Sequence, residues 1–314
     1  METKIIFMGT PDFAVPSLEG LINSNYQIAG VYTSPDKPAG RGQQQSISAI
    51  KKVALANNIE VRQPVSLRDP EEYRWLASLQ PHLVVVAAYG RILPGEIIDI
   101  PEYGCINVHP SLLPQYRGAT PVPAAILSGD SKTGVSIISM DEGMDTGPVI
   151  AMKEAEILPE ETAATLTERL GRLGAELLLE TIPGWMIGAI KPVPQDGQRA
   201  TYTKVIRKED GLLDWRLPAE YLERQSRAYK PWPGIYTYWR GKRLEVTKAT
   251  VMDNGAGSEA GEVRTIDKGA SRVVGVTTGN GILLLERVRM EGKKEISGDE
   301  FARGQRDFIG SRLT

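Results

Sequence analysis

The chain has 314 residues, 41% hydrophobic and 24% charged, a composition typical of a globular protein of about two domains. Its net charge of −2 argues against wholesale nucleic-acid binding, no run approaches the ~20 apolar residues of a membrane helix, and no signal peptide is expected at the start. One cysteine, Cys105, excludes an internal disulfide and fits a reducing cytoplasm, and with only two histidines it argues against a zinc site.

The first half of the chain alternates predicted strands and helices. Apolar runs at 4–8, 28–32 and 83–87 predict strands, and helices are expected at 15–24 and 47–57. The run at 83–87 is apolar throughout, as expected of a parallel strand covered on both faces. This alternation predicts a doubly wound α/β domain whose ligands bind beyond the carboxyl ends of its strands.

The loop after the first strand does not look like a nucleotide site. Only Gly9 follows that strand, whereas a dinucleotide-binding turn needs three spaced glycines for the backbone to approach a pyrophosphate. No phosphate loop of the G-x-x-x-x-G-K-[ST] kind is present either. The sequence therefore implies neither NAD nor ATP.

Two further apolar runs, 104–108 and 134–140, lead into polar residues. Asn107 and His109 are two positions apart on the first of these strands, so both side chains lie on one face. Asp145 follows the second strand on a glycine-flanked loop. An amide, an imidazole and a carboxylate at neighbouring strand ends can stabilise an oxyanion and move protons. Taken singly, the amide and imidazole could instead satisfy backbone groups, and the carboxylate could simply form a turn.

The second half changes character. A helix is expected at 162–190, where leucines recur every three or four residues, and a second helix near 218–229. The proline- and glycine-containing stretch between them predicts a linker. Beyond it come short β-prone runs that suggest a small barrel: 235–239, 244–246, 273–276 and 282–285.

We therefore divide the chain into a catalytic domain at 1–190, a linker at 191–208 and a barrel domain at 209–314. Residues 201–314 carry a formal charge of +5 and the rest −7. A mildly basic C-terminal part suits contact with a polyanion. By itself, however, this imbalance is within ordinary variation of surface charge between domains.

Several blocks together resemble the folate-dependent formyltransferases, over roughly residues 5 to 235. The blocks are 7–13, 34–42, 63–64, 87–90, 107–114, 116–119, 141–147 and 231–233. The resemblance implies a Rossmann-like formyltransferase domain followed by an OB-type barrel that binds nucleic acid. It also implies that Asn107, His109 and Asp145 carry catalysis.

The activity implied by the resemblance is transfer of a formyl group from 10-formyltetrahydrofolate to the α-amino group of initiator methionyl-tRNA. No metal is needed, and a cytoplasmic monomer is expected. Asn107 and a protonated His109 would stabilise the oxyanion, while Asp145 would raise the proton affinity of the imidazole. The step is expected to be direct, because Ser111 lacks an activating base and Cys105 is expected to be buried.

The resemblance also assigns binding residues. Three loops are expected to form the folate pocket, with backbone groups suited to a pterin edge and apolar side chains as walls: Tyr89, Gly90, Ile92, Ser111, Leu112, Leu113, Pro114, Asp141 and Gly143. In the loop 34–46, Arg41 is expected to recognise the tRNA and Lys37 to contact a phosphate more weakly. From composition alone, this loop would be taken for a solvated surface loop.

Two alternatives remain open at this point. A formyltransferase or formyl hydrolase acting on a small molecule, such as glycinamide ribonucleotide or an amino-sugar nucleotide, would share the same three catalytic residues. A non-catalytic RNA-binding protein with a vestigial α/β domain is a second possibility. The Arg41 loop and the basic barrel argue against the first, and the intact catalytic set argues against the second.

Overall fold

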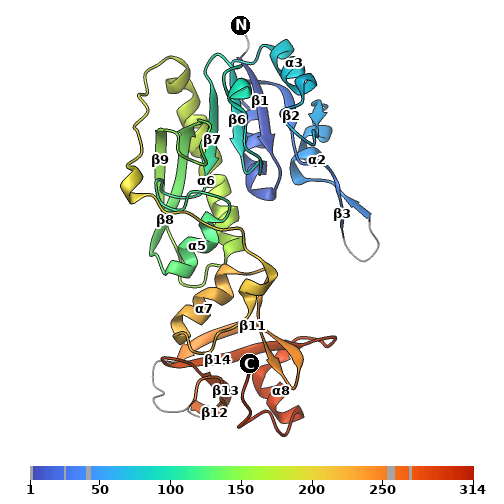
Figure 1. Ribbon diagram of the computed structural model, residues 1–314, viewed down its shortest axis with the longest axis vertical. Coiled ribbons are helices and arrows are strands. Elements are labelled where there is room, and N and C mark those ends of the chain that lie inside the picture. Colours follow the sequence, from blue (N-terminus) through green and yellow to red (C-terminus); the bar gives the residue numbers. More distant parts are fainter. Residues whose placement is uncertain (1–2, 25, 40–43, 253–258, 269–270) are drawn as a thin grey trace. The chain divides into compact units, whose positions relative to one another are not determined.

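The computed structural model describes residues 3–24, 26–39, 44–252, 259–268 and 271–314. The chain forms two compact units (Figure 1). The first comprises Met1–Val122, Lys132–Ile157 and Thr165–Lys204, and the second comprises Pro123–Ser131, Leu158–Ala164 and Val205–Thr314. Within the described ranges, no helix combines the length and the apolar character needed to cross a membrane.

A seven-stranded sheet forms the centre of the first unit. Its strands lie in the order β5 (Val61–Arg62), β2 (Tyr26–Tyr32), β1 (Thr3–Gly9), β6 (Leu83–Ala87), β7 (Cys105–His109), β8 (Lys132–Ser139) and β9 (Val149–Glu156). The first five strands in this order run parallel, as predicted. The last two pairings, β7 with β8 and β8 with β9, are antiparallel. The sheet is therefore mixed, with an antiparallel edge.

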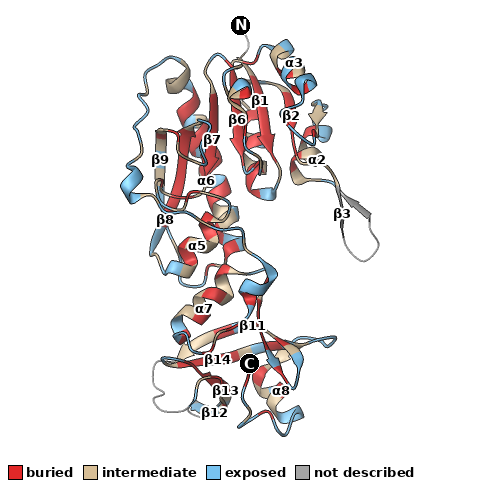
Figure 2. Ribbon diagram, viewed as in Figure 1, coloured by how far each residue is buried: buried red, intermediate tan, exposed pale blue. Residues whose placement is uncertain are grey.

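The middle strands of this sheet are covered on both faces. Every residue of β6 and β7 is buried, and so are the last five residues of β1 (Figure 2). One face packs into a cluster that includes Ile6, Met8, Val84, Val86 and Cys105. Continuous apolar runs form such strands because neither face meets water. The rigid layer positions the ends of β1, β6 and β7, from which the loops described below emerge.

Helices and two short extra strands complete the first part of the chain. The helical segments are η1 (Asp12–Ala14), α1 (Val15–Ile22), α2 (Ala49–Ala56), α3 (Pro70–Leu79), α4 (Gly95–Ile98), α5 (Pro121–Ser128), α6 (Ala163–Met186) and η2 (Gly197–Arg199). Helix α2 starts at Ser48, whose hydroxyl accepts a hydrogen bond from the backbone N–H of Lys51. Strands β3 (Lys37–Ala39) and β4 (Gln44–Ser46) form a separate antiparallel pair.

The second unit is built on a six-stranded antiparallel sheet. Its elements are η3 (Lys208–Gly211), α7 (Ala219–Ala228), β10 (Ile235–Trp239), β11 (Lys242–Met252), β12 (Val263–Lys268), β13 (Ser271–Thr277), β14 (Ile282–Met290), β15 (Ile296–Ser297) and α8 (Gly298–Gly304). The strand order is β10-β11-β14-β13-β12, with β15 paired to β14. An antiparallel domain of this kind agrees with the predicted small OB-type β domain. Strand β11 is longer than predicted and contains register shifts near Lys248, which bend a strand.

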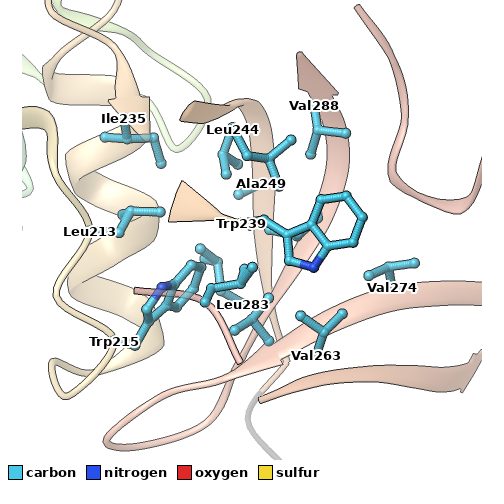
Figure 3. Close-up of a cluster of buried hydrophobic side chains, with 14 of the residues drawn as sticks. Leu213, Trp215, Ile235, Trp239, Leu244, Ala249, Val263, Val274, Leu283 and Val288 are labelled. Atoms are coloured by element: carbon cyan, nitrogen blue, oxygen red, sulfur yellow. The ribbon is translucent and has the colours of Figure 1, made fainter. Parts of the chain in front are cut away.

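Aromatic and aliphatic side chains fill the core of the second unit (Figure 3). Trp239 on β10 contacts Phe301 and Phe308 edge to face, with ring centroids 5.7 and 5.3 Å apart. Trp215 donates a hydrogen bond from its indole N–H to the Thr237 hydroxyl at 3.1 Å, so its polar atom is satisfied in the core. The unit thus has a hydrophobic core of its own.

Candidate active site

Asn107 and His109 lie on the same face of β7, as their spacing predicts. Both are buried, with exposures of 8% and 4%. The Asn107 amide donates a hydrogen bond from Nδ2 to Oδ1 of Asp145 at 3.4 Å. The Nδ1 atom of His109 lies 3.6 Å from the same carboxylate oxygen. The three side chains that the sequence singles out therefore converge on one point.

Asp145 reaches this point by a route that differs from the prediction. The doubly wound fold predicted parallel strands with the polar residues beyond their carboxyl ends, but β8 runs antiparallel to β7 and its last residue, Ser139, pairs with Ile106. The following loop must turn back toward His109, and Asp145 has a φ of +55°, in the left-handed region that aspartate tolerates better than most residues. Gly147 permits the turn, because a Cβ there would lie 1.8 Å from the Ser139 carbonyl oxygen.

The segment 116–118, which follows the Ser111–Pro114 turn, makes hydrogen bonds to both His109 and Asp145. The backbone N–H of Gly118 donates to Oδ2 of Asp145 at 2.8 Å. The Nε2 atom of His109 lies 3.1 Å from the carbonyl oxygen of Tyr116. Because a carbonyl can only accept, Nε2 carries the proton and donates it. In the neutral imidazole, Nδ1 is then the unprotonated nitrogen, and it is the one that lies near Asp145.

Burial sets the protonation state of His109. Desolvation disfavours the imidazolium and lowers its pKa below the usual 6.5, although the charge of Asp145 and the hydrogen bond to Tyr116 both act to raise it. Burial therefore favours the neutral imidazole in the resting site. The expectation of a protonated His109 took account of the neighbouring carboxylate, whereas burial of the ring acts in the opposite direction.

The Ser111–Pro114 turn is tied down by a buried hydroxyl on the neighbouring strand. Ser136 donates a hydrogen bond from Oγ to the Ser111 carbonyl at 2.7 Å and accepts one from the Leu113 N–H at 3.1 Å. Leu113 is buried. Leu112 lies over Gly134, where an added Cβ would come within 2.5 Å of its Cδ2 atom. Both leucines thus anchor the turn, and its backbone is held in a fixed shape.

The other residues expected to bind folate lie in two loops that approach each other. Gly95 is close enough to Glu142 that a Cβ on Gly95 would lie 2.3 Å from the Glu142 carboxylate. On the first loop, Gly90 has a φ of +77° and Ile92 is 74% exposed. On the second loop, Asp141 accepts hydrogen bonds from the Gly143 N–H and the Thr146 hydroxyl.

Tyr89 differs from its neighbours in this first loop. Its ring is buried in the core cluster with Met8 and Leu93, its hydroxyl has no hydrogen-bond partner among the described residues, and burial raises its pKa to about 12. Its backbone carbonyl accepts a hydrogen bond from the Thr10 hydroxyl. The side chain of Tyr89 therefore supports the loop from beneath.

Among the described residues, neither the serine nor the cysteine close to the three converging residues is an activated nucleophile. Ser111 is buried, and its hydroxyl donates to the Gln115 carbonyl oxygen at 2.6 Å. Cys105 is buried as predicted, and burial raises its pKa to about 12, so it is a thiol at neutral pH. This arrangement favours direct transfer over a covalent intermediate.

The two residues expected to contact tRNA are placed differently. Lys37 begins strand β3. Arg41 lies outside the described residues.

Two residues near the site were not predicted to have a role. Gln195 donates from Nε2 to the carbonyl oxygens of Asp145 and Gly147, at 2.9 and 2.7 Å. Arg117, only 5% exposed, donates to Oε1 of Gln195 from Nε and Nη2, at 3.1 and 2.8 Å. Gln195 lies in the stretch that the sequence predicts as a linker. The only sequence signal for a role there is a polar side chain that follows two prolines.

Comparisons with known proteins identify the family of this chain. Residues 3–182 match the formyl transferase family, and residues 205–306 match the formyl transferase C-terminal domain. A methionyl-tRNA formyltransferase of Chloroflexus aurantiacus is 45% identical over 301 residues, 96% of each chain. One of Dehalococcoides mccartyi is 44% identical over 312 residues, 99% of each chain.

Solved structures show the same fold at low identity. WlaRD, a sugar 3N-formyl transferase, superposes with a TM-score of 0.66 and 18% identity over 94% of this chain and 100% of that chain. An N-formyltransferase from Helicobacter canadensis superposes with a TM-score of 0.66 and 18% identity over 91% of this chain and 99% of that chain. On the strength of the family match and the near full-length relatives, the chain belongs to the formyl transferase family, among the methionyl-tRNA formyltransferases.

Proposed function

We propose that this protein transfers the formyl group of 10-formyltetrahydrofolate to the α-amino group of methionine on initiator tRNA. The observation that carries the proposal is the convergence of Asn107, His109 and Asp145 within 3.6 Å in a chain of this family. An amide donor, a neutral imidazole and a carboxylate are the groups that an amine-to-carbonyl acyl transfer requires.

The loops around the site fit a flat, partly apolar ligand. The Ser111–Pro114 turn offers a backbone fixed by Ser136, and Ile92 and Met144 expose apolar side chains on the two loops that meet at Gly95. Such a mixture of fixed backbone groups and apolar walls suits a pterin ring. When bound, the folate supplies a formyl group on nitrogen, already activated for attack by an amine.

Asn107 supplies the electrostatic part of the mechanism. Its carboxamide has two N–H donors, of which one is directed to Asp145. The second can donate to the formyl oxygen as negative charge develops on it. A preorganised donor of this kind is typically worth ~3 to 4 kcal/mol in the transition state.

His109 and Asp145 supply the proton path. The hydrogen bond from Nε2 to Tyr116 leaves Nδ1 as the proton acceptor, and it lies beside the Asp145 carboxylate. The attacking amine must lose a proton, and Nδ1 can take it. The imidazolium that forms is stabilised by the carboxylate, whose other oxygen is fixed by Gly118. The proton can then pass to the departing folate nitrogen.

Transfer to a small amine, as in the sugar formyltransferases of similar fold, is the alternative. The near full-length relatives and the +5 charge of residues 201–314 favour tRNA. The test is a formylation assay with charged initiator tRNA, charged elongator tRNA, free methionine and an amino-sugar nucleotide. Rapid formylation of the initiator species alone supports the proposal, and transfer to a small amine in preference to tRNA refutes it.

The Arg41 loop provides a sharper test of tRNA recognition. Arg41→Ala should lower kcat/KM for the initiator species and narrow the preference over the elongator, since a guanidinium contact is typically worth ~1 to 3 kcal/mol. Binding of folate should not change. The matched control is Arg68→Ala, which removes the same charge from an exposed position before α3. Equal effects of the two substitutions would remove Arg41 from the recognition set.

Two broader parts of the proposal concern the protein in the cell. We propose that it works in the cytoplasm, where a protein with one buried, unpaired cysteine is at no redox disadvantage. We also propose that it acts as a monomer. Analytical ultracentrifugation at micromolar concentration, with and without tRNA, would reveal any dimer.

A further inference from the structure

The segment 195–203 is distant in sequence from the active-site residues, but in the fold it lies beside the loops that carry them. Within the first unit, it contacts both of the backbone elements that hold His109 and Asp145. These contacts include directional hydrogen bonds, which fix the positions of the groups that they join.

Gln195 fixes the loop that carries Asp145. Its side-chain amide donates hydrogen bonds to the backbone carbonyl oxygens of Asp145 and of Gly147. Asp145 has left-handed backbone geometry in a loop of largely exposed residues, so local preferences hold it weakly. A bidentate clamp at this point sets where the carboxylate lies.

Arg117 orients the clamp. An amide can be rotated by half a turn, which would place its oxygen against the two carbonyls. The guanidinium of Arg117 donates two hydrogen bonds to Oε1 of Gln195 and a third to the hydroxyl of Tyr202 at 3.1 Å. Since Arg117 has no acceptor, it selects the orientation in which the N–H groups of Gln195 face the Asp145 loop.

Residues 201–203, at the end of the segment, make hydrogen bonds to residues 116 and 117 beside His109. The backbone of Arg117 receives a hydrogen bond from Thr203 and donates one to Thr201, at 2.8 and 2.9 Å. The Tyr116 N–H donates to the Thr201 hydroxyl at 2.8 Å. Tyr116 is the acceptor for His109, and Gly118 the donor to Asp145, so these bonds fix both partners of the proton path.

We infer that Gln195, Thr201 and Thr203 form a positioning element of the active site, with Gln195 as the residue that places the Asp145 carboxylate against His109. The inference rests on the proposed function only in that formyl transfer is one of its readouts. Gln195 touches no reacting atom and acts through the Asp145 loop. The nearby charged groups that share in the arrangement are Arg117 and Asp145.

The test compares two substitutions of Gln195 in the full-length protein. Gln195→Ala removes both functions of the side chain. Gln195→Glu keeps an acceptor for Arg117 and adds an ion pair with it, but presents no N–H to the carbonyl oxygens of Asp145 and Gly147. We expect both variants to lose roughly 10- to 100-fold in kcat, as misplacement of a catalytic group by about an ångström does. KM for folate should change little.

The control is Gln198→Ala, in the same segment. The side chain of Gln198 is exposed and its backbone N–H bonds to Asp196, so we expect wild-type kcat. If Gln195→Glu retains wild-type kcat, the side chain serves only to satisfy Arg117 and the inference is overturned. If Gln195→Ala loses kcat only in proportion to a lowered Tm, the role is structural, and the inference is again overturned.

A readout independent of turnover separates this inference from the proposed function. The chain contains only His82 and His109, so nuclear magnetic resonance of ¹⁵N-histidine protein yields two ring systems. In Gln195→Ala the His109 signals should shift and its titration should move to lower pH, because the Asp145 charge is no longer held beside it. His82 should not change. Unchanged His109 signals would refute positioning even if no formyl transfer is detected in the wild type.

Discussion

Removing one buried oxygen atom tests whether the Ser111–Pro114 turn is held by strand β8. Ser136→Ala leaves almost no cavity, but it orphans the Ser111 carbonyl and the Leu113 N–H, which bond to the Ser136 hydroxyl at 2.7 and 3.1 Å. An unsatisfied buried backbone group costs about 1 to 3 kcal/mol, so the two together cost roughly 2 to 6 kcal/mol. We expect the free energy of unfolding of the first unit to fall by that amount, unless the turn detaches.

Detachment of the turn would appear in folate binding instead. The assay therefore pairs thermal unfolding with KM for the formyl donor, where each 1.4 kcal/mol lost corresponds to about tenfold. The control is Ser78→Ala, which removes a hydroxyl that donates to the Trp75 carbonyl at an exposed place on α3 and should change stability by less than about 0.5 kcal/mol. If Ser136→Ala matches that control in both Tm and KM, the two hydrogen bonds do not hold the turn.

Three further outcomes are expected. Alanine at Asn107, His109 or Asp145 should lower kcat by about 10²-fold or more at saturating substrates with the fold retained, and near-normal turnover would remove that residue from the catalytic set. The pKa of His109 is lowered in the folded state, so the unfolded protein binds more protons than the folded protein below pH 6.5. The free energy of unfolding should therefore fall as the pH drops from 6.5 through the folded pKa. In His109→Asn, denaturant titrations should show a weaker dependence of stability on pH. Affinity for initiator tRNA should weaken with salt, with a log-log slope of about −0.9 per duplex phosphate neutralised, and a flat response would contradict an electrostatic role for the net positive charge of residues 201–314.

Local pattern was sufficient for much of the fold. The all-apolar run at 83–87 coincides with strand β6, and the helix predicted at 47–57 contains α2 with its Ser48 cap. The antiparallel course of β8 could not be predicted in this way. A buried strand shows the same apolar run whichever way it points, so direction depends on the connection and on neighbours distant in the sequence.

The site likewise has features that follow from local sequence pattern and features that depend on residues distant in the sequence. Asn107 and His109 share a face because alternation along a strand is a local rule, and their convergence with Asp145 was expected from the motifs. The roles of Gln195 and Arg117 depend on contacts across 50 and 78 residues, which no local spacing reveals. The lowered pKa of His109 depends on how far the fold buries the ring, and a sequence motif does not encode the loss of solvent.

The left-handed backbone at Asp145 also bears on how such an enzyme can change over time. Few residues other than glycine occupy a φ of +55° without strain, and asparagine, one base change from aspartate in the genetic code, is among the best tolerated of those with a Cβ. That replacement would keep the loop and the hydrogen bond from Gly118 while removing the negative charge. A duplicated gene could therefore yield, in a single mutational step, a stably folded homologue that still binds its ligands but no longer turns them over.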